Sequence, residues 1–217
     1  VEQKMYPNIY AATHVLFVLA VIALSVIGNG TRLYLSPRAE GSRRDDLFAN
    51  AFSVVTAQPT TTGYYNNSQT EPFRKLGANV LESSFFSKEI ALRMLRQQRW
   101  KVALYGTIWT AAAAYHRWDL ALLAVLAQAI FSEHVLSKWL RLEWLARRFE
   151  SSYRQLGQFS EAVPQNPELA QRRILEAVCF YETSKAAAGI VLSSKVFQDL
   201  NQSLNERWAT IRTNLGL

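Results

Sequence analysis

The amino-acid sequence predicts an all-α membrane protein with three transmembrane helices and a cytoplasmic helical bundle. Three apolar stretches without formal charge lie among charged segments, and elsewhere apolar residues recur at the three- and four-residue spacing of one helix face. Basic residues flank the apolar stretches on particular sides, which is typical of membrane proteins. The predicted parts are an N-terminal transmembrane helix over residues 1–35, a cytoplasmic loop and helices over 36–99, a transmembrane hairpin over 100–140, and a C-terminal cytoplasmic helical region over 141–217.

Composition excludes several other classes of protein. Of 217 residues, 49% are apolar and only 19% are charged, so the chain is neither a disordered protein nor a coiled-coil rod. The single cysteine, Cys179, excludes a disulfide framework and a multi-cysteine zinc site, and we expect no metal and no cofactor. The net charge is +7, but the arginine pairs are scattered rather than gathered as in a nucleic-acid binder.

The first apolar stretch, residues 11–28, is long enough for a membrane helix because about 20 apolar residues span the hydrocarbon core. We expect a retained anchor rather than a cleaved signal peptide. Lys4 stands beside Glu2 as the one basic residue before the stretch, and no small-x-small cleavage site follows cleanly.

The second and third stretches, residues 102–115 and 120–132, are shorter, and runs of that length are more often buried core helices or re-entrant segments. Their flanks favour spanning. Trp100 and Trp118 bracket the second stretch about 27 Å apart on a helix, which is close to the hydrocarbon thickness. We expect a spanning helical hairpin; the alternative is a buried pair of helices in a soluble domain behind one anchor.

The positions of the basic residues set the orientation. They follow the first stretch, precede the second and follow the third: Arg32, Arg38, Arg43 and Arg44; Arg93, Arg96, Arg99 and Lys101; Lys138, Arg141, Arg147 and Arg148. If all three apolar stretches span the membrane, the three groups of basic residues fall on the same side of it. The positive-inside rule then places the N-terminus outside and the C-terminus in the cytoplasm.

Helix signals organise the cytoplasmic segments. A short helix is predicted over residues 43–55 with Ser42 as N-cap, and another over 77–99, which can run into the second apolar stretch because no breaker intervenes. A further helix continues from residue 138, with Gly157 and Pro164 ending it.

Two more helices are predicted near the C-terminus. Asn166 as N-cap and Pro167 at the first position begin one that runs towards Phe197. Residues 201–203 interrupt it, and an amphipathic helix follows with Leu204 and Trp208 on its apolar face.

Candidate ligand contacts come from a polar loop and from scattered cations. Tyr rings can stack on bases, Asn amides match base edges, and Arg side chains hold phosphates by paired hydrogen bonds. The candidates are Arg43, Arg44, Tyr64, Tyr65, Asn66, Asn67, Lys185 and Lys195. The alternatives are an Asn- and Gly-rich turn whose tyrosines pack on the bundle, and a solvated helix face for the lysines.

Weakly polar and ionisable side chains within or beside the spans are candidates for a pore or its gate. They are Ser25, Thr107, Thr110, Gln128, Glu133 and His134. An ionisable residue in a membrane segment indicates function by default, although Glu133 lies shallow enough to reach the interface instead.

No sequence motif of an enzyme is present: the chain lacks a P-loop, G-x-S-x-G, H-E-x-x-H and C-x-x-C. We therefore expect a non-enzymatic protein, with an enzyme on a membrane scaffold as a remote alternative.

The run YETSKAAAGIVLSSK at residues 181–195, followed by Leu200-Asn201 and by Leu204 and Trp208, is similar to uncharacterised bacterial membrane proteins. In size and organisation the chain resembles small multi-span membrane effectors of bacterial anti-phage systems. The resemblance implies an inner-membrane protein that oligomerises with its own copies, senses a cyclic nucleotide or a partner through its cytoplasmic helices, and permeabilises the bilayer. The alternative is a membrane anchor that recruits a soluble partner protein.

Overall fold

The computed structural model describes residues 7–54, 65, 67–114, 127, 133–161 and 166–217, which form helices joined by turns and short loops, with no strand among them. The elements are α1 (Pro7–Gly30), the π-helical turn η1 (Thr31–Leu35), α2 (Ser36–Phe52), α3 (Pro72–Ala114), the π-helical turn η2 (Glu133–Ser137), α5 (Lys138–Glu161), α6 (Pro167–Ala188) and α7 (Ser194–Leu215). The predicted all-α fold is confirmed. The chain divides into two compact units, Val1–Arg44 and Asp45–Leu217.

The first unit is helical from α1 through η1 into the start of α2. Large apolar side chains of α1 are exposed, including Leu16 at 67% and Ile27 at 65%. In the part of the chain that the structure describes, one helical run, Val15–Phe52, is long and apolar enough to cross a membrane, with a mean hydropathy of 1.8 in its most apolar window.

The predicted start of a helix at Ser42 is wrong. Ser42 lies inside α2, where its hydroxyl donates to the carbonyl of Arg38 at 3.3 Å. No N-cap is needed because α2 continues the preceding helix through η1, and the backbone N–H of Ser36 donates to the carbonyl of Thr31. The wider π-helical turn precedes Pro37, whose ring removes one backbone donor, and so the helix continues without a break.

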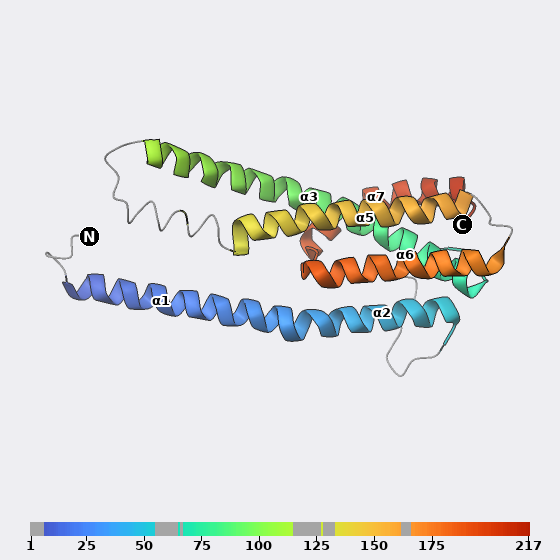
Figure 1. Cartoon of the computed structure of the whole chain (residues 1–217), viewed down its shortest axis with the longest axis horizontal. Helices are drawn as coiled ribbons and strands as arrows, with labels where there is room; N and C mark the ends of the chain where they lie inside the picture. Colours follow the sequence, from blue (N-terminus) through green and yellow to red (C-terminus); the bar gives the residue numbers. More distant parts are fainter. Residues whose placement is uncertain (1–6, 55–64, 66, 115–126, 128–132, 162–165) are drawn as a thin grey trace. The chain divides into compact units, whose positions relative to one another are not determined.

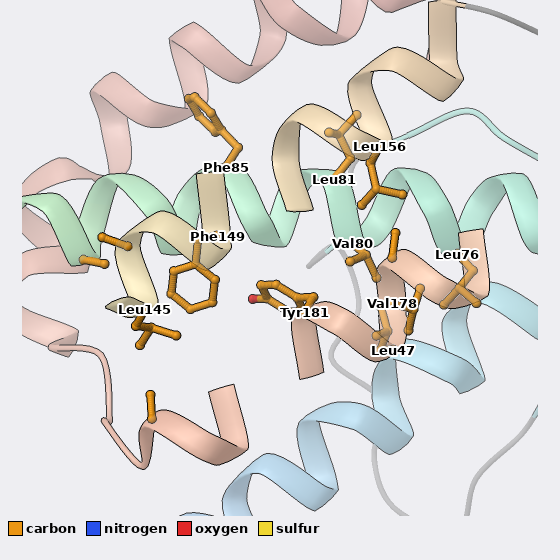
Figure 2. Close-up of a cluster of buried hydrophobic side chains, with 14 of the residues drawn as sticks. Leu47, Leu76, Val80, Leu81, Phe85, Leu145, Phe149, Leu156, Val178 and Tyr181 are labelled. Atoms are coloured by element: carbon orange, nitrogen blue, oxygen red, sulfur yellow. The ribbon is translucent and has the colours of Figure 1, made fainter. Parts of the chain in front are cut away.

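The second unit is a bundle in which α3, α5, α6 and α7 pack along one another (Figure 1). Figure 2 shows its core, where Phe85 and Leu81 of α3 lie near residues of α5 and Tyr181 of α6. The α7 helix adds Trp208, whose ring stacks on Phe85 with centroids 5.9 Å apart. Leu47, from the last turns of α2, is fully buried in the same core.

The α3 helix confirms the prediction that the helix over residues 77–99 continues into the second apolar stretch. It runs unbroken for 43 residues, which at 1.5 Å per residue is about 64 Å. The third stretch lies outside the described residues apart from Ala127, and so does the predicted connection at residues 116–119.

The ends of the later helices agree with the prediction in part. Asn166 caps α6 as predicted: its side chain accepts from the backbone N–H groups of Glu168 and Leu169, with Pro167 at the first position. The predicted end at Gly157 is wrong, since α5 runs on to Glu161, and Pro164, the other residue predicted to end it, lies outside the described residues. An added Cβ at Gly157 would meet nothing within 4 Å, and glycine in an open, helical position does not by itself end a helix.

The break predicted at residues 201–203 is also wrong, because these residues lie within α7. The chain turns earlier, at Gly189, whose φ of 55° and ψ of 35° are in the left-handed region that glycine adopts readily. Ser193 then caps α7 by accepting from the backbone N–H of Val196 at 3.3 Å. Residues 201–203 are polar and largely solvent-facing, so the helix tolerates them.

Candidate functional site

The long helix α3 changes character along its length. From Leu76 to Gln98, many of its side chains are buried in the bundle. Beyond Gln98 it exposes large apolar side chains: Trp100 at 74%, Leu104 at 59%, Tyr105 at 43%, Ile108 at 46% and Trp109 at 37%. One continuous helix therefore joins a packed core to an apolar surface that the described part of the chain leaves open.

The junction between these two parts is fastened to the start of α5. Gln98 donates from Nε2 to the carbonyl of Val135 in η2 at 3.0 Å. Arg99 donates to both carboxylate oxygens of Glu143, at 2.9 and 2.8 Å, and Arg147 approaches the same carboxylate at 3.4 Å. Two of the three contacts cross from α3 to the η2–α5 segment, so the two elements are linked where the packed part of α3 ends.

Glu143 is held in its charged form at this junction. The hydrogen bond from Arg99 is the largest influence and, with the charges of Arg99 and Arg147, it lowers the pKa of the Glu143 carboxyl below its ordinary value. The ionised carboxylate is the acceptor for both arginines, so the junction keeps its contacts at neutral pH.

Exposed aromatic, leucine and basic side chains surround this ion pair along both helices. We call this set the collar; it comprises Arg96, Arg99, Trp100, Leu140, Trp144 and Arg147. Trp144 also faces the Arg148 guanidinium, with 5.2 Å between the guanidinium carbon and the ring centroid. Trp and Arg together are the side chains found where a protein surface meets both an apolar medium and water.

The residues predicted to line a pore fall in both units. Thr107 and Thr110 lie on the exposed part of α3, and their hydroxyls donate to the carbonyls of Ala103 and Gly106 within the same helix, at 2.9 and 2.8 Å. Ser25 is exposed on α1 and its carbonyl accepts from the Asn29 amide at 2.9 Å. The two threonine hydroxyls are satisfied locally, as is usual for Ser and Thr within apolar helices.

The other three pore candidates are not described at the side-chain level. Gln128 lies outside the described residues. Glu133 and His134 form the first turn of η2, where only their backbone is described.

Asn67, predicted as a ligand contact, belongs to a chain of three amides, of which the central one is buried and the other two are half-buried. Its Nδ2 donates to Oδ1 of Asn79 at 2.7 Å, and its own Oδ1 accepts from the backbone N–H of Gln69 at 3.2 Å. Asn79 is fully buried and donates in turn to Oδ1 of Asn50 at 3.0 Å. We call Asn50, Asn79 and Asn67 the amide chain; it ties the end of α2 and the residue-67 segment to α3.

Sequence reasoning missed Asn79, although a signal was present. It stands between Leu76 and Val80 on the apolar face of α3, where an isolated amide requires polar partners.

The remaining ligand candidates belong to different elements of the chain. Arg43 pairs with Glu40 at 2.9 Å on α2, and Arg44 is exposed beside it, both in the first unit. Tyr65 is half-buried against the bundle core. Tyr64 and Asn66 lie outside the described residues.

The two lysines lie near the other end of the packed part of α3. The ammonium group of Lys185 is 5.6 Å from the centroid of the Tyr181 ring, and Lys195 is exposed in the first turn of α7. The start of α7 is placed by Ser193, whose backbone N–H contacts the sulfur of Met94 at 3.3 Å. Met94 and Asn79 are 15 positions apart on α3, or about 22 Å, which exceeds the size of an ordinary small-molecule pocket. The structure therefore does not bring Asn67 and Lys195 into one such pocket.

No metal centre is formed by the described residues, which contain no group of three or more His, Cys, Asp or Glu side chains able to hold an ion. Comparison with known proteins gives no match to a family model, to a curated protein or to a solved structure.

Proposed function

We propose that this protein is a bacterial inner-membrane effector, acting in anti-phage defence, that permeabilises the bilayer as an oligomer when its cytoplasmic bundle senses a nucleotide-derived signal or a partner. The observation that carries the proposal is the continuity of α3. Its first part is packed in the bundle, and its last part exposes apolar side chains on the same unbroken helix.

The exposed apolar surface supports attachment to a membrane at two places. The α1 helix exposes its leucines, valines and isoleucines, and so does α3 from residue 100 to residue 109. Apolar surface of this extent is unfavourable in water and is stabilised when lipid or another protein covers it. Exposure of Leu104 and Ile108 also favours a spanning hairpin over the alternative of a hairpin buried within a soluble domain.

The residues of the collar support a particular position of α3 along the bilayer normal. Trp100 and Trp144 have an apolar ring with one N–H that prefers water, and the arginines beside them favour the anionic cytoplasmic surface. We place the collar at the cytoplasmic interface, with the bundle in the cytoplasm and residues 102–114 in the hydrocarbon core.

The mechanism follows from the rigidity of a continuous helix. A ligand or partner that binds one arrangement of the bundle more tightly shifts the population towards that arrangement. Because α3 does not break between the core and the collar, a shift of its packed part is carried to its apolar part. The Gln98–Val135 and Arg99–Glu143 contacts transmit the same shift to the start of α5. In an oligomer, Thr107 and Thr110 would then face neighbouring copies or the pore.

Membrane potential tests this proposal directly. The full chain is expressed in bacteria, with membrane insertion confirmed, and a voltage-sensitive dye is read with and without a panel of cyclic nucleotides. Ligand-dependent depolarisation is the expected result. A stable potential across the panel would exclude these nucleotides as the trigger and favour either a partner protein as the trigger or the alternative of an anchor that recruits a soluble protein.

A matched pair of variants tests the junction in the same assay. Arg99→Ala removes the paired hydrogen bonds to Glu143, and we expect it to weaken the depolarisation. Arg93→Ala removes an exposed arginine from the same helix and should leave the response unchanged. Equal responses of both variants would remove the junction from the mechanism.

A further inference from the structure

A cavity of about 580 Å³ opens at one end of the bundle, where α3 and α6 begin and α5 and α7 end. Its volume is in the range of sites for small molecules, which is 300 to 1,000 Å³. None of the residues that the sequence suggested as ligand contacts lines it. It lies at the opposite end of α3 from the exposed apolar part.

The floor of the cavity is apolar and formed by three helices. Gly77, Ala78 and Leu81 come from α3, Leu156 from α5 and Ile174 from α6. Gly77 lies close to Ile174, since a Cβ at residue 77 would be in van der Waals contact with that side chain at 3.4 Å. An apolar floor favours a ligand with a flat, apolar body, since its burial releases water from both surfaces.

One wall adds an aromatic ring, because Phe73 lines the cavity beside this floor. Aromatic rings pair favourably with other ring systems by offset stacking or edge contacts. The floor and this wall together favour a planar ring over a flexible aliphatic chain.

The rim of the cavity is polar, and part of it is already engaged. The Glu71 carboxylate accepts from the backbone N–H groups of Phe73 and Arg74, at 3.1 and 2.7 Å, and so caps the start of α3. Gln69 donates to the carbonyl of Gly216 at 3.3 Å. The first N–H groups of α6 are capped by Asn166. The helix starts are therefore not the groups that a ligand would meet.

Among the described lining residues, the polar side chains left to contact a ligand are those of Thr70, Arg74 of α3 and Gln171 of α6. A guanidinium binds a phosphate through paired, charge-assisted hydrogen bonds. A carboxamide presents one donor and one acceptor, which match the edge of a nucleobase. The rim thus offers one cationic and one amide contact above an apolar floor.

We propose that this cavity is a binding site for a nucleoside phosphate, with the base on the apolar floor, its edge at Gln171 and the phosphate at Arg74. As the sensory site of the proposed effector, this inference rests on the proposed function. It locates the signal on α3 itself: Gly77 in the floor and Ala114 at the last residue of α3 are 37 positions apart, about 56 Å along one helix.

The test is isothermal titration of the full chain in nanodiscs with AMP, GMP, CMP and UMP, and with the nucleoside of the tightest binder. We expect saturable binding of at least one nucleotide and about tenfold weaker binding of its nucleoside, because the charge-assisted contact is lost. Arg74→Gln should weaken the nucleotide about tenfold and leave the nucleoside unchanged. Lys75→Gln, a cation at the next position that does not line the cavity, should change neither.

A second variant fills the cavity from its rim. Ala170, a half-buried lining residue in the first turn of α6, is replaced by Phe, and circular dichroism confirms that the helices remain. Ala170→Phe should abolish binding of both nucleotide and nucleoside. Absence of saturable heat from all four nucleotides with folded wild-type protein would overturn the site, and so would nucleotide binding that Ala170→Phe leaves intact.

The outcomes for the site and for the effector are separable. Nucleotide binding with a stable membrane potential would contradict an effector gated by that nucleotide and leave the site. Depolarisation that Ala170→Phe does not change would contradict the site and leave the effector.

Discussion

Removing the central amide of the amide chain should destabilise the bundle measurably. Asn79→Ala deletes two hydrogen bonds, one to Asn50 and one from Asn67, from a side chain that is fully buried. Each bond contributes about 0.5–1.5 kcal/mol, and the two half-buried partners each lose a hydrogen-bonding partner, so we expect a loss of about 2–4 kcal/mol. For a chain of this size, that corresponds to a fall in Tm of roughly 4–16 °C.

Chemical and thermal unfolding of the full chain in detergent, followed by circular dichroism, measures this loss. The matched control is Asn205→Ala, which removes an exposed amide that donates to Asn201 at 3.1 Å on the surface of α7. The control should change stability by less than about 0.5 kcal/mol. If Asn79→Ala were equally mild, the amide chain would not be structural, and the Asn67 amide would be available to a ligand after all.

Three further predictions concern α3, the core and the junction. Lys101→Pro removes a backbone hydrogen bond of α3 just beyond the core and destabilises the helix by about 3 kcal/mol. Depolarisation should therefore be lost in Lys101→Pro and retained in Lys101→Ala. Equal responses of the two variants would contradict transmission through α3. Tyr181→Phe removes the 2.8 Å bond between the Tyr181 hydroxyl and Ser87 and should cost about 1–2 kcal/mol in urea unfolding; a change under 0.3 kcal/mol would show that the bond contributes little. Arg99 lowers the pKa of the Glu143 carboxyl. The stability that this pair contributes is therefore present above the ordinary glutamate pKa and is lost as the pH falls through the lowered pKa. Glu143→Gln should reduce this pH-dependent loss of stability, by under about 1 kcal/mol, in unfolding measured from pH 7 to 3.

The sequence was sufficient to predict those structural features that depend on neighbouring residues alone. The Asn166–Pro167 cap begins α6 because its geometry depends on adjacent residues alone. The absence of a breaker between residues 77 and 114 was likewise enough to predict that α3 continues into the second apolar stretch.

The failures have a common physical origin. Ser42 is of a residue type that favours an N-cap, but a cap is needed only where a helix starts, and the preceding helix does not end before Ser42. The polar residues 201–203 predict a break, yet solvent exposure makes polar residues harmless in a helix, whereas Gly189 changes the backbone direction.

The cavity could not be predicted because its lining comes from positions 69 to 217, brought together only by packing. Arg74 and Gln171 lie almost a hundred positions apart in the sequence, and neither belongs to a motif. Asn79 was missed for a related reason: its role depends on partners at positions 50 and 67 that only the fold brings within reach.

Cysteine labelling of α3 in intact membranes tests most directly whether this helix leaves the bundle and enters the bilayer. In a Cys179→Ser background, single cysteines replace Gln97, Leu104, Ile108 and Ala111, all of which are exposed in the structure. Because the described part of the chain leaves these positions exposed, burial in the bundle does not account for protection from a water-soluble maleimide there. We predict labelling at position 97 from the cytoplasmic side and protection at 104, 108 and 111 until detergent removes the lipid. Equal labelling of all four in intact membranes would contradict the account.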